Sequence, residues 1–180
     1  MSKHIISFFS IIYFIMILVA CQSTGPKSRL TPEEQAKFIS EGKAITMFSF
    51  KAFSKELSRA INDGGIQYAV DYCHLKASPL VDSLSRSKKV KISRISSKYR
   101  NLNDKPDQLD QSVLDTYQEQ LDRGDQLQPH LEVTAAEVIF YSPILILDPV
   151  CLNCHGEPGL TMLADNLNYI KSKYPEDIAY

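Results

Sequence analysis

Two cysteines and a histidine stand close together near the C-terminus, in the stretch PVCLNCHGEP. Cys151 and Cys154 flank two residues, and His155 follows directly. In c-type haem attachment, two thiols with this spacing add to the haem vinyl groups, and the adjacent histidine becomes the proximal ligand of the iron. Of the chemistries that a Cys-x-x-Cys pair supports, only this one requires the histidine. The spacing therefore favours one covalently bound haem c.

Three other interpretations of the motif stay open. A redox dithiol would place the two cysteines at the start of a helix in a βαβ unit, but the Gly and Pro residues in 156–159 argue against a long helix there. A zinc site needs further ligands, and only Cys73, His74 and His130 could supply them. A plain disulfide within the motif would have a structural role only.

The N-terminus is predicted to be an export signal that precedes the folded domain. Lys3 is followed by an apolar run over residues 5–20, which is short of the ~20 residues that a spanning helix needs. A basic start and a short apolar run are typical of a signal peptide. The end of this run, LVAC, resembles a bacterial lipobox, in which Cys21 carries the lipid. The alternative is a simple signal or an N-terminal membrane helix, with Cys21 incidental.

These features predict three segments: a signal peptide over 1–20, a lipidated cysteine and polar tether over 21–30, and one domain over 31–180. Several lipid chains hold a protein firmly at a membrane. We therefore expect an exported lipoprotein on the periplasmic side, at the outer membrane where one exists. Bacterial haem attachment takes place outside the cytoplasmic membrane, which agrees with export.

Composition narrows the partners and the disulfide chemistry. The chain has 180 residues and a formal net charge of −1, so no electrostatic bias points to nucleic acid. It has four cysteines. If Cys21 carries lipid, three remain, and an odd number leaves one thiol without a disulfide partner.

The pattern of elements predicts an α+β fold. Thr31, Pro32 and Glu34 form a capping box at the start of a long helix that Gly64 and Gly65 end. A helix of ~30 residues would be ~45 Å long. It is therefore expected to project from the domain, to kink, or to pair with a second copy in a homodimer.

A second helix is expected from Ile66 to the residue before Pro79. Ile66, Ala69, Val70 and Cys73 recur at helical spacing, so Cys73 should face the core. Further along, we expect a strand over 90–100, a helix over 106–123, two or three strands over 130–147 and a closing helix over 163–175. This order indicates a small antiparallel sheet with flanking helices.

The residues alone leave the second iron ligand open. Cys73 is the thiol without a disulfide partner, and it lies on an apolar helix face. Core burial is an equally simple reason for a cysteine there. His74 and His130 are more simply partly exposed residues, and Met47 and Met162 are more simply core residues.

Several short pieces in one order carry a resemblance to a known family: VDYCHLKASP, ISRISSKYRNLNDKPD, EVIFYSPILI, CLNCHG and YPEDIAY. Over about residues 35–180 the chain resembles the PAS-like, single-haem c-type domains found alone or in front of bacterial signalling modules. The resemblance implies a PAS-like fold with iron bound by His155 and Cys73. The chain departs from the family at Ser142, where Lys is usual, and in lacking a Gly-rich tail.

These observations together predict a function that is not enzymatic. With both axial positions filled, the iron has no open site for substrate, so the protein would sense redox state or a diatomic gas, or carry electrons to an unknown redox or signalling partner. A thiolate ligand predicts a low reduction potential. Arg94 and Arg100 are candidate partners of the haem propionates, or part of a solvated basic segment. The alternative function is a thiol–disulfide oxidoreductase that uses Cys151 and Cys154.

Overall fold

The computed structural model describes residues 29–180. The predicted signal peptide, Cys21 and the tether up to residue 28 lie outside the described residues, so those predictions stay untested. Within the described part of the chain, no helix is both long and apolar enough to cross a membrane.

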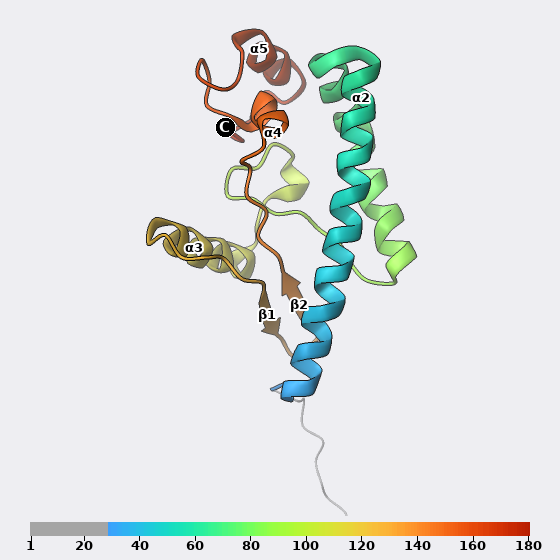
Figure 1. Ribbon diagram of the computed structural model, residues 1–180, viewed down its shortest axis with the longest axis vertical. Coiled ribbons are helices and arrows are strands. Elements are labelled where there is room, and N and C mark those ends of the chain that lie inside the picture. The colour runs from blue at the N-terminus through green and yellow to red at the C-terminus, as the bar shows by residue number, and fades with distance from the viewer. Residues whose placement is uncertain (1–28) are drawn as a thin grey trace, which may run out of the picture.

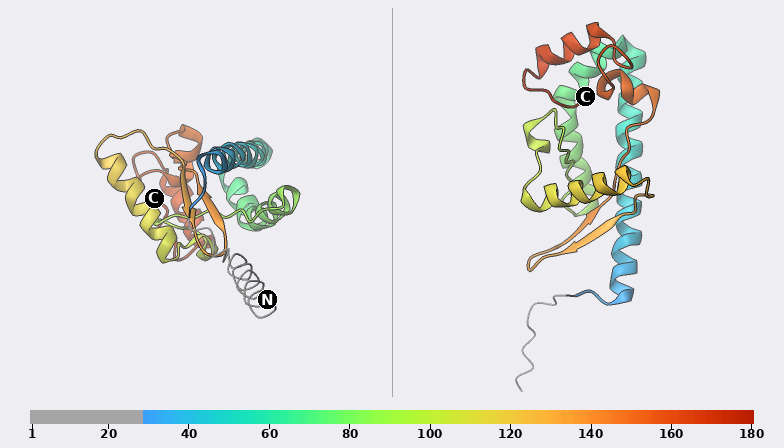
Figure 2. Two further views of the ribbon diagram at one scale, coloured as in Figure 1. Left: turned by 90° about the horizontal axis from the view of Figure 1, so that it is seen from below. Right: turned by 90° about the vertical axis from the view of Figure 1, so that its left-hand side faces the viewer.

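The longest element is α2, Pro32–Lys88, which begins at the predicted capping box. The Thr31 hydroxyl accepts from the Glu34 amide at 3.2 Å, and the Glu34 carboxylate accepts from the Thr31 amide at 2.8 Å. Gly64 and Gly65 leave helical geometry, and Gly65 has a φ of 75°, which glycine adopts without a Cβ clash. The predicted end of the first helix is thus confirmed. The two arms of α2, residues 32–63 and 66–88, double back on each other (Figures 1 and 2).

A polar contact clamps the two arms together near the Gly64–Gly65 turn. Tyr72, on the second arm, donates to the Glu56 carboxylate on the first arm. Arg59 donates to Glu56 at 2.8 Å and to the Tyr72 hydroxyl at 2.9 Å. These bonds lower the pKa of Glu56, with the Tyr72 hydrogen bond as the largest cause.

Pro79 does not end the second helix, contrary to the sequence-based prediction. The arm continues to Lys88, with Pro79 inside it, and Leu84 in the added turns is buried. A proline inside a helix removes one backbone hydrogen bond. Burial of Leu84 offsets part of that loss.

The strand predicted over 90–100 is also absent: this segment is irregular. Its amides bond locally instead, with Ile92 N donating to the Ser85 hydroxyl at 3.0 Å and Ser96 N to the Asp104 carbonyl at 3.1 Å. Within this segment the side chains of Arg94 and Arg100 are half-buried, so they face the interior rather than solvent.

The sheet has two antiparallel strands, β1, His130–Val133, and β2, Val138–Tyr141, paired from His130↔Tyr141 to Val133↔Val138. Gly42 on the first arm approaches this sheet so closely that a Cβ would lie 2.3 Å from the Phe140 ring. The short helix η2, Leu102–Asp104, and helix α3, Gln108–Asp122, precede the strands. Helix α3 begins at Gln108 after its cap Asp107, two residues later than the predicted start at 106, and Leu121 near its end is exposed.

Two short helices complete the chain: α4, Pro149–His155, and α5, Ala164–Lys173. Val70, Met162 and Ile170 form a core cluster between α2 and this C-terminal part. Figure 2 shows α4 and α5 at one end of the molecule, here called the site end, and β1 and β2 toward the other, the sheet end. The predicted α+β class, with a long N-terminal helix, flanking helices and a small antiparallel sheet, is confirmed.

Candidate functional site

Helix α4 consists almost entirely of the motif. Asp148 caps it by accepting from the Val150 amide at 2.8 Å, and Pro149 occupies a first-turn position. Gly156 ends the helix, and its amide donates to the Leu152 carbonyl at 3.0 Å. The absence of a long helix after the motif agrees with the sequence. Cys151 and Cys154 are both half-buried free thiols, so no disulfide joins them.

His155 is held on one side and open on the other. Its Nδ1 lies 3.2 Å from the Ala179 carbonyl oxygen. Because a carbonyl only accepts, Nδ1 carries the proton in this bond, and Nε2 keeps its lone pair. The side chain is exposed to solvent, yet the surrounding protein lowers its pKa, first through burial and then through the charge of Arg100.

Arg100 links α4 to the C-terminal tail. Its Nη2 donates to the Cys154 carbonyl at 2.6 Å, and its Nε donates to Asp177 Oδ1 at 3.1 Å. Asp177 Oδ1 also accepts from the Ala179 amide at 3.0 Å. The Arg100 guanidinium therefore connects the residue before His155 directly, and the tail residue Ala179 through Asp177.

Cys73 lies on the second arm of α2, half-buried, with a free thiol. Burial raises its pKa, while the positive charges of Arg94 and Arg100 act in the opposite direction. Burial also raises the pKa of Cys154, which the charge of Arg100 opposes and a charge on Cys73 reinforces. The structure thus brings Cys73, both predicted arginines and the motif into one neighbourhood.

The residue two positions before Cys73 anchors this part of the arm to α5. The Asp71 carboxylate accepts from the Tyr169 hydroxyl at 2.6 Å and pairs with Lys173 at 2.9 Å. Tyr72 is bonded to the first arm through Glu56. Asp71 is thus bonded to α5 and Tyr72 to the first arm of α2. These two contacts limit the movement of the next residue, Cys73, relative to α4.

Arg94 offers an unpaired donor inside this neighbourhood. Its Nη2 contacts Asp104 Oδ2 at 3.1 Å, and its guanidinium lies 5.2 Å from the centre of the Phe53 ring. Its Nε is buried and has no hydrogen-bond partner among the described residues. A buried donor without an acceptor is costly, so an external acceptor such as a carboxylate fits here. Together with free thiols and an open imidazole nitrogen, this donor set fits a haem.

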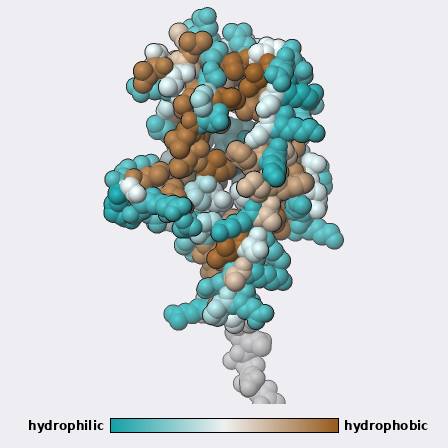
Figure 3. All heavy atoms as spheres, viewed as in Figure 1, coloured by the Kyte–Doolittle hydropathy of each residue, from teal (hydrophilic) through white to brown (hydrophobic). Residues whose placement is uncertain are grey.

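Apolar side chains are exposed next to the motif. Ile144 and Leu147, which precede α4, and Val150 in its first turn are 59%, 73% and 46% exposed. Figure 3 shows hydrophobic residues gathered in the middle of one face of the molecule, beside a hollow. Such a surface fits a large apolar group better than water.

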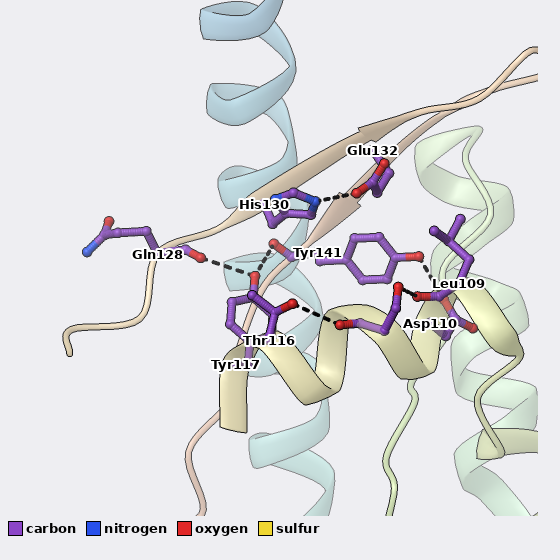
Figure 4. A network of polar contacts seen from close by, with 9 residues as sticks. Leu109, Asp110, Thr116, Tyr117, Gln128, His130, Glu132 and Tyr141 are labelled. Atoms are coloured by element: carbon purple, nitrogen blue, oxygen red, sulfur yellow. Dashed lines mark hydrogen bonds and ion pairs between the residues drawn. The ribbon is translucent and has the colours of Figure 1, made fainter. Parts of the chain in front are cut away.

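The other candidate iron ligands lie elsewhere or are engaged. His130, on β1, has Nε2 bonded to Glu132 at 2.7 Å and belongs to a polar network at the sheet end (Figure 4). The His74 ring packs edge-on against Tyr174 at 4.8 Å. Met162 is a core residue, as predicted, whereas Met47 is 55% exposed and the prediction of a core role for it is wrong.

Two alternatives for the motif lose support from the geometry. A nucleophilic dithiol needs a lowered thiol pKa, but burial raises the pKa of Cys151 and the charge of Asp148 raises it further. Within residues 29–180, no group of three or more His, Cys, Asp or Glu side chains could hold a metal ion, so the zinc interpretation lacks its ligands.

Sequence reasoning did not identify Asp104 and Asp177 as site residues. Asp104 pairs with Arg94, and Asp177 pairs with Arg100 over a separation of 77 residues. Asp177 belongs to the piece YPEDIAY, which carries the family resemblance. The piece does not indicate that the Asp177 carboxylate pairs with Arg100.

Residues 27–179 match the model of the Tll0287-like family, so the chain belongs to that family. Searches of curated proteins and of solved structures give no match.

Proposed function

We propose that the chain is an exported c-type haem protein in which Cys151 and Cys154 hold one haem through thioether bonds. His155 and Cys73 would be the two iron ligands. The observation that carries this proposal is the His155 ring, whose Nδ1 is held by the Ala179 carbonyl while Nε2 has no hydrogen-bond partner among the described residues. Family membership supports the same class of protein.

The residues around the site have separate tasks. The Ala179 carbonyl keeps the imidazole proton on Nδ1, which makes Nε2 the ligand atom. Burial raises the pKa of Cys73, and the charges of Arg94 and Arg100 oppose that shift. The unpaired Nε of Arg94 would bind a propionate. A bound haem c supplies one-electron transfer and, on loss of one axial bond, a site for a diatomic gas.

This arrangement fits a redox or gas sensor, or an electron carrier, rather than an enzyme. Two protein ligands leave no position for a substrate. The protein would be anchored on the periplasmic side through a lipid on Cys21 and would act on a separate redox or signalling protein, as a monomer or a homodimer. Nucleic acid is not among its expected partners.

The first test is a pyridine haemochrome spectrum of the full chain produced with the c-type maturation machinery. A c-type band that survives acid-acetone extraction is expected. Its absence, together with disulfide reductase activity, would establish the thiol–disulfide oxidoreductase instead. The spectrum detects the covalently bound haem directly, so the test needs no special growth medium.

Cys73→Ala tests the second ligand. The haem stays attached through Cys151 and Cys154, the Soret band shifts, and the reduction potential rises because a charge-donating thiolate is lost. We expect a rise of about 100 mV or more, within the ~0.8 V over which axial ligands set haem potentials. His130→Ala is the control and should change neither property. An unshifted spectrum in Cys73→Ala would mean that another residue is the ligand.

A further inference from the structure

Asp177 is a carboxylate in an unusual place, near the end of the chain yet buried. Its side chain has 0% exposure. Burial of a charged group is unfavourable unless hydrogen bonds and an opposite charge compensate it. Oδ1 receives two hydrogen bonds, from the Arg100 Nε and the Ala179 amide. Oδ2 is buried and has no partner among the described residues. The chain thus retains a costly group at this position.

The contact between Asp177 and Ala179 fixes the backbone next to His155. A side-chain carboxylate that accepts from the amide two residues later forms a local turn, which sets the orientation of the following peptide groups. The Ala179 amide is held at 3.0 Å by this carboxylate, and the Ala179 carbonyl lies 3.2 Å from His155 Nδ1. The amide of Ala179 is therefore bonded to Asp177, and the carbonyl of Ala179 is bonded to the His155 imidazole.

Arg100 adds a second connection from Asp177 to the same histidine. Its guanidinium bridges Asp177 Oδ1 and the carbonyl of Cys154, the residue directly before His155. The Arg100 side chain is only 14% exposed, and a planar guanidinium holds its two acceptors in a fixed relation. Asp177 is thus connected to the tail carbonyl that His155 meets and to the helix turn that carries His155.

We propose that Asp177 is the positioning residue of His155: through Ala179 and Arg100 it fixes the plane of the imidazole and keeps Nε2 as the ligand atom. This inference rests on the proposed haem ligation and deepens it. It also gives Arg100 a different task from Arg94, because two of the three Arg100 guanidine nitrogens are already bonded within the protein.

The test uses the full chain with haem attached and compares Asp177→Ala with Asp177→Asn. Asp177→Ala removes both acceptor contacts, whereas the asparagine oxygen can still accept from Ala179 and Arg100. We expect unchanged covalent haem per chain in both variants. In Asp177→Ala the reduction potential should rise, because a less firmly held Nδ1 proton makes the imidazole a weaker donor. The ferric electron paramagnetic resonance spectrum should change from one low-spin species to several. Asp177→Asn should restore most of the wild-type signature.

Asp110→Ala is the matched control, since Asp110 also accepts a hydrogen bond from a largely buried partner, Tyr141, at 2.8 Å but belongs to α3. It should leave potential and spectrum unchanged. If Asp177→Ala gives no folded protein, Asp177→Glu keeps the buried charge and displaces the acceptor, and should shift the potential in the same direction by less.

The outcomes separate this inference from the proposed function. Wild-type potential and spectrum in Asp177→Ala, or equal shifts in Asp177→Ala and Asp110→Ala, would overturn the positioning role while haem binding stands. A wild-type chain without covalent haem would overturn both.

Discussion

The two ends of the molecule each present a histidine, and the two are held in opposite ways. At the sheet end, His130 has its Nε2 bonded to the Glu132 carboxylate, on a largely exposed strand. At the site end, His155 has its Nδ1 bonded to a backbone carbonyl, and its Nε2 has no hydrogen-bond partner within residues 29–180. The two histidines thus differ in their partner atoms, and only His155 leaves Nε2 available for the iron ligation proposed above.

The same contrast extends to the surroundings of each histidine. The network in Figure 4 bonds Tyr141 to Asp110 at 2.8 Å and Tyr117 to the Gln128 carbonyl at 3.1 Å, within one stretch of sequence. At the site end, the contacts of Arg100 join positions 54 and 77 residues away. The site end therefore depends on long-range contacts for its geometry, whereas the polar network around His130 joins residues within the stretch 110–141.

The largest expected effect on stability concerns the core of the site end. Ile170, on α5, is completely buried in the cluster with Val70 and Met162. Ile170→Ala should lower the free energy of unfolding by about 2–5 kcal/mol, through lost burial and a cavity. Urea denaturation followed by circular dichroism measures it. Val113→Ala, in α3, removes a smaller side chain and should cost less. An equal or greater loss in Val113→Ala would contradict the view that the site end is the better-packed one.

A smaller effect is expected where the first arm of α2 meets the sheet. Gly42→Ala would place a Cβ at 2.3 Å from the Phe140 ring, and such overpacking costs about 1–3 kcal/mol. The haem spectrum should stay unchanged, because the clash lies at the sheet end. Phe140→Leu combined with Gly42→Ala should recover part of the loss in urea denaturation. A fully stable single variant would show that the ring can move aside without cost.

The smallest effect concerns acid pH at the clamp between the two arms. The pKa of Glu56 is lowered from 4.5, chiefly by the Tyr72 hydrogen bond and then by Arg59. A carboxyl group with a lowered folded-state pKa contributes stability above its unfolded pKa and loses it as pH falls through the folded value. Below about pH 4.5 the melting temperature should therefore fall less steeply in Glu56→Gln than in the wild type. Glu41→Gln, at an exposed position of the same arm, should keep the wild-type slope.

Local signals in the sequence predicted the local structure well. The capping box at Thr31 and Glu34, the Gly64–Gly65 break and the absence of a long helix after the motif all depend on neighbours within a few residues. Pro79 and the segment 90–100 were predicted wrongly, because burial of Leu84 and the inward arginines outweighed local preference. Tertiary contacts commonly override propensity in this way.

The site could be predicted only in part. Spacing identified Cys151, Cys154 and His155, and helical periodicity placed Cys73 on a face that is half-buried in the structure. Arg94 and Arg100 were candidates, but their different surroundings depend on Asp104 and Asp177, which meet them from distant segments. The periodicity of a segment shows which of its residues share a face, but not which distant carboxylate an arginine on that face will pair with.

The Gly64–Gly65 turn has a consequence for the order in which the chain folds. The two arms of α2 are neighbours in sequence, so their pairing closes only a short loop and is expected early. The tail that carries Ala179 contacts His155 from 24 residues away and Arg100, through Asp177, from 77. Pulsed hydrogen exchange should therefore protect amides of α2 before those of the tail. The arm that carries Cys73 would then form before the tail bonds to His155 Nδ1.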